Sequence, residues 1–130
     1  MQKRKLLIAV PIAIVAFLLL RCWSVLIFTD TVATWRHYAG LLLYLPLIFL
    51  FFKKYKKATI GTGIYLLLET FNILSCMPVL KTSWITFNFS SPISTPPIQL
   101  ISLGIFVIYF ILNLDSLIEI YLDYKGVKAA

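Results

Sequence analysis

Residues that usually carry enzyme chemistry are scarce in this chain of 130 residues. It has one histidine, His37, and two cysteines, Cys22 and Cys76, which show neither the paired spacing of a zinc site nor a C-x-x-C redox motif. Phosphate-binding loops, the H-E-x-x-H zinc motif and the G-x-S-x-G nucleophile motif are also missing from the sequence. We therefore expect no metal, no cofactor and no enzymatic activity.

Charge is also sparse, because only 13% of the residues are charged while 61% are hydrophobic and the mean hydropathy is +0.94. A soluble domain averages about 25% charged residues, so this composition excludes an ordinary water-soluble core. The net charge is +7, but the basic residues form short runs beside hydrophobic segments instead of covering a folded face. This arrangement argues against nucleic acid as a partner and indicates that lipid is the solvent.

Four hydrophobic segments are long enough to cross a bilayer, whose hydrocarbon core of about 30 Å needs about 20 helical residues. The first segment follows three basic residues, as a secretory signal peptide does. No signal-peptidase cleavage site comes after it, so we expect this segment to stay in the protein. The fold class we predict is an all-α membrane protein with a four-transmembrane-helix bundle. Residues 1–130 are expected to form a single integral membrane domain, with spans over about 6–28, 33–52, 58–80 and 98–121.

The positive charges predict the orientation of this bundle. If the N-terminus is inside, nine of the twelve lysines and arginines lie in cytoplasmic segments, the exceptions being Arg21, Arg36 and Lys81. Both the N-terminus and the C-terminus are therefore expected in the cytoplasm, with the protein in a plasma membrane such as the bacterial inner membrane. The tight turn between the second and third spans is expected to face anionic lipid with its four lysines, Lys53, Lys54, Lys56 and Lys57.

A polar face runs along the third predicted span. Glu69 lies near the middle of this span, where a carboxylate costs about 2.5 to 3.5 kcal/mol and should face protein or water. Spacings of three and four residues place it on one helical face with other polar side chains, in the order Thr62, Tyr65, Glu69, Asn72 and Cys76. Two interpretations fit this face: a packing seam that is hydrogen-bonded across the bundle, or a proton or cation path centred on Glu69.

Partners for the residues of this face come from the first predicted span. Arg21 is a candidate ion-pair partner of Glu69, because the two residues differ by only about 6 Å in predicted depth. Cys22 and Cys76 also lie at similar depths, so a disulfide between the first and third helices is one alternative and two packed, free thiols the other. The Gly61-Thr62-Gly63 segment is expected to let the third helix pack closely on a neighbour.

An acidic face lies at the C-terminal end of the fourth predicted span, where Asp115, Glu119 and Asp123 are spaced by four residues. We expect these carboxylates to pair with the lysines of the Lys53–Lys57 turn at the same level, and the alternative is a docking surface for a cytoplasmic partner. His37 is expected just outside the membrane, where an interfacial position needs no special chemistry. Its alternative role is a proton sensor or a headgroup contact.

Three functions fit this sequence. The first is a non-enzymatic accessory or scaffolding subunit, whose partners are the lipid bilayer and other membrane proteins or a second copy. The second is a small homo-oligomeric transporter or channel, coupled to protons or cations through Glu69. In length and helix number the chain is similar to the small multidrug transporters, but that family carries its membrane-embedded Glu in the first helix, where this chain has Arg21. The third is an envelope sensor acting through the outer loop 81–97, in which the alternation of residues 84–90 predicts a short β-strand.

Overall fold

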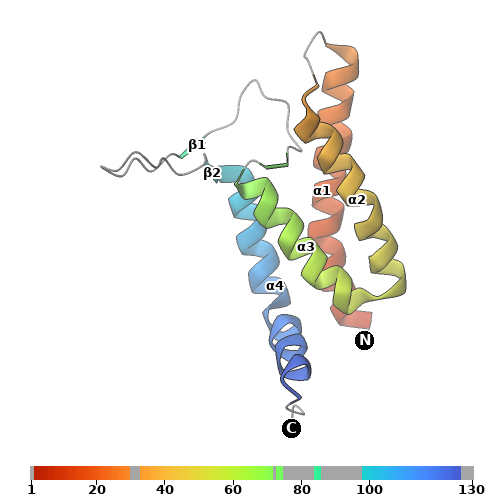
Figure 1. Cartoon of the computed structure of the whole chain (residues 1–130), viewed down its shortest axis with the longest axis vertical. Coiled ribbons are helices and arrows are strands. Elements are labelled where there is room, and N and C mark those ends of the chain that lie inside the picture. The colour runs from red at the N-terminus through yellow and green to blue at the C-terminus, as the bar shows by residue number, and fades with distance from the viewer. Residues whose placement is uncertain (1, 30–32, 72, 75–83, 86–97, 127–130) are drawn as a thin grey trace.

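The structure is a computed structural model and describes residues 2–29, 33–71, 73–74, 84–85 and 98–126. Its elements, in chain order, are α1 (Gln2–Phe28), α2 (Trp35–Lys53), α3 (Tyr55–Thr70), β1 (Trp84–Ile85), β2 (Ile98–Gln99) and α4 (Leu100–Tyr124). Successive helices run in opposite directions, so the N-terminus, the α2–α3 turn and the C-terminal end of α4 lie at one end of the molecule (Figure 1). We call this end the basic end, because the lysines of the turn lie there.

Three of the helices are long and apolar enough to cross a membrane: α1 with 27 residues, α2 with 19 and α4 with 25. These lengths and their composition indicate membrane association, as the sequence predicts. Large hydrophobic side chains are exposed along all three helices, for example Phe17 at 65%, Leu42 at 69% and Ile111 at 68%. Such exposure would be unfavourable in water and is expected of surfaces that face lipid.

Helix α3 is shorter than the span predicted over residues 58–80. It has 16 residues, or about 24 Å at about 1.5 Å per residue, and it ends at Thr70. The Thr70 hydroxyl donates a 2.8 Å hydrogen bond to the Leu66 carbonyl, and the Ile73 N–H bonds the Leu68 carbonyl five residues back. The bond of Ile73 departs from the regular four-residue ladder, and the helix has ended before it. Residues 75–80 of the predicted span lie outside the described part.

A single residue, Lys54, separates α2 from α3, which confirms the tight turn. Its N–H donates to the Leu50 carbonyl at 2.7 Å, and its own carbonyl accepts the N–H of Ala58 at 3.0 Å. The residue therefore satisfies an end group of both helices, and its extended backbone, with φ −143° and ψ 77°, reverses the chain direction.

The core forms where α3 packs on α2 and on α4, with α1 against α3 and α4. Two glycines of α3 permit this packing, as expected: a Cβ on Gly61 would lie 3.0 Å from the Leu47 Cδ1 atom on α2. On the other side, a Cβ on Gly63 would lie 2.9 Å from the Tyr109 hydroxyl on α4. Helix α3 is therefore held closely between its two neighbours.

The two strands form a minimal antiparallel pair, in which Trp84 lies opposite Gln99 and Ile85 opposite Ile98. Trp84 and Ile85 are the first two residues of the strand predicted over 84–90. Residues 86–90 lie outside the described part, so the rest of that strand stays a prediction.

Candidate functional site

The predicted polar face of α3 points into the bundle over the length that the structure describes. Thr62 and Glu69 have no exposed surface, and Tyr65 is 4% exposed. The other two residues of the face, Asn72 and Cys76, lie outside the described residues. The face therefore belongs to the interior of the bundle and not to its lipid-facing surface.

Three buried tyrosines join the four helices in chain order. The Tyr44 hydroxyl of α2 donates to the Ile12 carbonyl of α1 at 2.8 Å, and Tyr65 of α3 donates to the Gly40 carbonyl of α2 at 2.9 Å. The Tyr109 hydroxyl of α4 donates to the Thr59 carbonyl of α3 at 2.5 Å. Each carbonyl has a second lone pair beyond the one that its own helix uses, so these bonds add to the helical ladders without breaking them.

These links were only partly predictable. Tyr65 stood out because it shares a face with Glu69, but Tyr44 and Tyr109 lie within continuous hydrophobic segments and gave no separate signal. Other buried hydroxyls are satisfied within their own helix, since Thr62 donates to the Ala58 carbonyl at 2.8 Å. Together the bonds form a seam of polar groups in an otherwise apolar core.

Fully buried polar side chains from all four helices are found at the level of Glu69. The register of α3 on α2 follows from two contacts, Gly61 with Leu47 and Tyr65 with Gly40. One turn farther along the antiparallel helices, the same register places Glu69 level with His37. The register of α3 on α4 brings Glu69 level with Ser102 in the same way, and Cys22 of α1 lies near Glu69. We call this set the polar cluster; none of its members has exposed surface: Cys22, His37, Glu69 and Ser102.

His37, which is expected at the membrane interface, is fully buried within the bundle, and its depth relative to the membrane stays a prediction. It is the third residue of α2, and its Nδ1 atom lies 3.1 Å from the Thr34 nitrogen and 2.9 Å from the Thr34 hydroxyl oxygen. Because Nδ1 accepts the Thr34 N–H, the neutral imidazole carries its proton on Nε2. The spacing of Thr34 and His37 is that of a capping box, which was the signal in the sequence for this arrangement.

Arg21 does not meet Glu69 in this structure, so the predicted ion pair is not formed. The buried face of α1 follows helical spacing through Ile12, Val15, Leu19 and Cys22, and Arg21 lies off this face and is exposed. Similar depth in the membrane is therefore not enough to form this ion pair, because the rotation of α1 about its axis turns Arg21 outward.

The structure describes one of the two cysteines considered for a disulfide. Cys22 is a buried free thiol, while Cys76 lies outside the described residues. The described part of the chain contains no group of three histidine, cysteine or acidic side chains placed to hold a metal ion.

At the basic end, ion pairs connect α4 to α1 and α3. The Lys56 Nζ atom lies 2.6 Å from Asp123 Oδ2 and 3.5 Å from Glu119 Oε1, and Arg4 also pairs with Glu119. The hydrogen bond to Asp123 raises the pKa of Lys56 above its ordinary value, so the ammonium stays charged beyond the usual lysine range. The expected pairing of the acidic face with the lysine turn is thus observed for Lys56, and Arg4 joins it unpredicted.

Asp115, the third residue of the acidic face, behaves differently. It is exposed, and no ion pair reaches it from the residues that the structure describes. Two residues, or about half a turn, away on the same helix, Asn113 is 1% exposed and donates to the Tyr109 carbonyl at 3.0 Å, so the two polar residues occupy opposite sides of α4.

The acidic and hydroxyl side chains described above thus include an interior set, an ion-paired set at the basic end, and Asp115 on the outer surface. No protein-family model matches the chain, and the comparisons with curated proteins and with solved structures find no similar protein.

Proposed function

We propose that this protein is an integral membrane protein of four transmembrane helices that acts as a non-enzymatic accessory or scaffolding subunit for another membrane protein. In this proposal the basic end lies in the cytoplasm, and the membrane is a plasma membrane of the bacterial inner-membrane type. Three apolar helices of sufficient length and the concentration of lysines at one end support this placement.

The observation that carries the scaffolding role is the exposed carboxylate of Asp115 on the outer face of α4. Its neighbours on that face are large, apolar and exposed: Ile108 at 47%, Ile111 at 68% and Ile118 at 49%. Asp115 lies one turn, about 6 Å, farther from the basic end than Glu119, which already belongs to the ion-paired set.

A carboxylate at the centre of a transmembrane helix costs about 2.5 to 3.5 kcal/mol, and Asp115 lies nearer the membrane surface, so a second chain that satisfies it gains part of this amount on binding. The occupant that fits this face is a hydrophobic helix of another membrane protein with a basic or hydrogen-bond-donating side chain at the depth of Asp115. The surrounding isoleucines supply the packing surface, and Asp115 fixes the position of the partner helix along α4.

The same structure supports a packing role for Glu69 over transport. Glu69 has no exposed surface, and the hydroxyl groups near it along α3 are engaged with backbone carbonyls. The sensor alternative depends on the loop 81–97, of which only Trp84 and Ile85 are described.

Site-specific cross-linking in native membranes tests the scaffolding role. A photoreactive phenylalanine analogue at Ile111 should capture one defined membrane protein, whereas the same analogue at Phe17, which is 65% exposed on α1, should not. Asp115→Leu should abolish the adduct at Ile111, and Asp115→Glu should keep it. Equal adducts from the two positions, or an adduct that survives Asp115→Leu, would refute the proposal, and an adduct of twice the chain mass would assign the face to self-association instead.

A further inference from the structure

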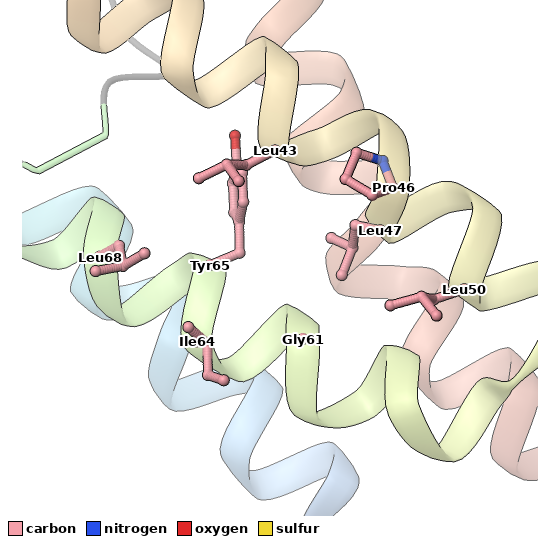
Figure 2. A pocket seen from close by; sticks show the side chains of 8 residues that line it. All are labelled: Leu43, Pro46, Leu47, Leu50, Gly61, Ile64, Tyr65 and Leu68. Atoms are coloured by element: carbon pink, nitrogen blue, oxygen red, sulfur yellow. The ribbon is translucent and has the colours of Figure 1, made fainter.

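An apolar groove of about 190 Å³ lies between α2 and α3 (Figure 2). Its walls are formed on α2 by Leu43, Pro46 and Leu50, and on α3 by Gly61, Ile64 and Leu68. Gly61 forms part of the α3 wall, where a Cβ would lie 3.0 Å from the Leu47 Cδ1 atom, so the two helices approach closely beside the groove. The one polar group nearby, the Tyr65 hydroxyl, is engaged with the Gly40 carbonyl, so the groove offers only apolar contact.

The depth of the groove matches the acyl chains of one leaflet. Leu50 lies three residues from Lys53, or about 5 Å along α2, and Leu43 lies ten residues away, or about 15 Å. The hydrocarbon core is about 30 Å thick, so with Lys53 at the membrane surface the groove spans the half next to the basic end. The groove has room for about six groups of the size of a water molecule, about 30 Å³ each. This volume suits part of one acyl chain and is too small for a helix, which is about 10 Å wide.

The basic end, beyond Leu50 and Gly61 of the groove, carries positive charge that is not ion-paired. Lys53, Lys54 and Lys57 are exposed, and in the described part of the chain no carboxylate forms an ion pair with any of them. The remaining lysine of the turn, Lys56, is engaged with the acidic residues of α4. The turn therefore presents three ammonium groups a few ångströms beyond an acyl-sized groove.

We propose that this face binds an anionic phospholipid of the cytoplasmic leaflet, with one acyl chain in the α2–α3 groove and the phosphate headgroup on Lys53, Lys54 and Lys57. The inference rests on the proposed membrane orientation, since it needs the basic end at a lipid surface. A zwitterionic lipid would fill the same groove but would gain less from the lysines, each of which contributes about fivefold in affinity for an anionic surface.

Native mass spectrometry of the full chain in detergent tests the proposal, with an equimolar mixture of dioleoyl phosphatidylglycerol and dioleoyl phosphatidylcholine as the probe. The unaltered chain should retain phosphatidylglycerol in preference. The triple variant Lys53→Gln, Lys54→Gln, Lys57→Gln should lower this preference by about fivefold or more. A matched variant that removes the same charge elsewhere at the basic end, Lys3→Gln, Lys5→Gln, Lys125→Gln, should leave it nearly unchanged.

A second pair of variants tests the groove itself. Leu43→Trp fills the groove and should produce a several-fold fall in retained phosphatidylglycerol. Leu42→Trp places the same ring on the adjacent residue, which faces outward at 69% exposure, and should not. Ile64→Trp, which fills the groove from α3, should repeat the result of Leu43→Trp.

Three results would overturn the inference: equal retention of the two lipids, equal loss in both charge variants, or full retention by both groove-filling variants. Failure of the membrane orientation is recognised separately, because a reporter fused to the C-terminus would then lie on the far side of the membrane. A cytoplasmic reporter combined with equal lipid retention would refute the lipid site alone.

Discussion

The contact between Gly63 of α3 and Tyr109 of α4 gives the sharpest test of how this bundle is held together. In Gly63→Ala the new Cβ would lie 2.9 Å from the Tyr109 hydroxyl oxygen, 3.2 Å from Cε1 and 3.3 Å from Cζ. Carbon atoms normally approach to about 3.5 to 4.0 Å, so the tyrosine ring or the whole of α4 must move. The ring is 2% exposed and tied to the Thr59 carbonyl, so it has no free space to move into.

The cost follows from three contributions. Overpacking of a tight contact costs about 1 to 3 kcal/mol, and the interhelical hydrogen bond of Tyr109 contributes about 0.6 kcal/mol on average in membrane bundles. Alanine recovers up to about 1 kcal/mol of helix propensity over glycine. The net loss expected for Gly63→Ala is therefore about 1 to 3 kcal/mol.

The measurement is unfolding of the purified protein in a mild detergent titrated with sodium dodecyl sulfate, followed by circular dichroism. Gly104→Ala is the matched control, because a Cβ on Gly104 would meet no atom within 4 Å, and its stability should equal or exceed that of the unaltered chain. Adding Tyr109→Phe to Gly63→Ala removes the closest atom, so the double variant should lose less stability than the sum of the single variants. If Gly63→Ala is as stable as Gly104→Ala, α3 and α4 are not packed as described.

Two further predictions concern buried groups. Tyr65→Phe should cost about 0.5 to 1.5 kcal/mol of unfolding free energy, because its hydroxyl bonds α3 to α2, while Tyr124→Phe at an 88% exposed position should change nothing. Equal stability of the two variants would remove Tyr65 from the seam. In a Cys76→Ser background, Cys22 should react with a maleimide only after sodium dodecyl sulfate unfolds the protein, because the thiol is fully buried. Rapid labelling of the folded protein, followed by mass spectrometry, would contradict the packing of α1.

The lengths of the apolar segments predicted α1, α2 and α4 well, because about 20 apolar residues in lipid have no alternative to a helix that satisfies its own backbone. The same reasoning predicted a third helix that is longer than α3 in the structure. Most residues after Thr70 are still apolar, but hydrophobicity does not report the hydrogen bond from the Ile73 N–H to the Leu68 carbonyl, which departs from the helical ladder.

The polar face of α3 was predictable from spacing alone, since residues three and four apart share a side of any helix. What that face meets was not predictable. Arg21 and Glu69 have opposite charges and similar depths, but contact also depends on the rotation of α1, and its buried stripe excludes Arg21. The burial of His37 was not predictable for a related reason, because a position at the end of a span does not say whether the side chain points outward or folds back toward the bundle.

The sequence by itself determined that lipid is the expected solvent, where the apolar helices lie and which end carries the positive charge, because these depend on composition and on the period of a helix. Only the tertiary structure decided which polar groups come together. The tyrosine-to-carbonyl bonds, the polar cluster at Glu69 and the groove between α2 and α3 all depend on the register and rotation of helices relative to one another. These are set by how closely the helices pack at Gly61 and Gly63, a property of pairs of surfaces that a one-dimensional pattern does not contain.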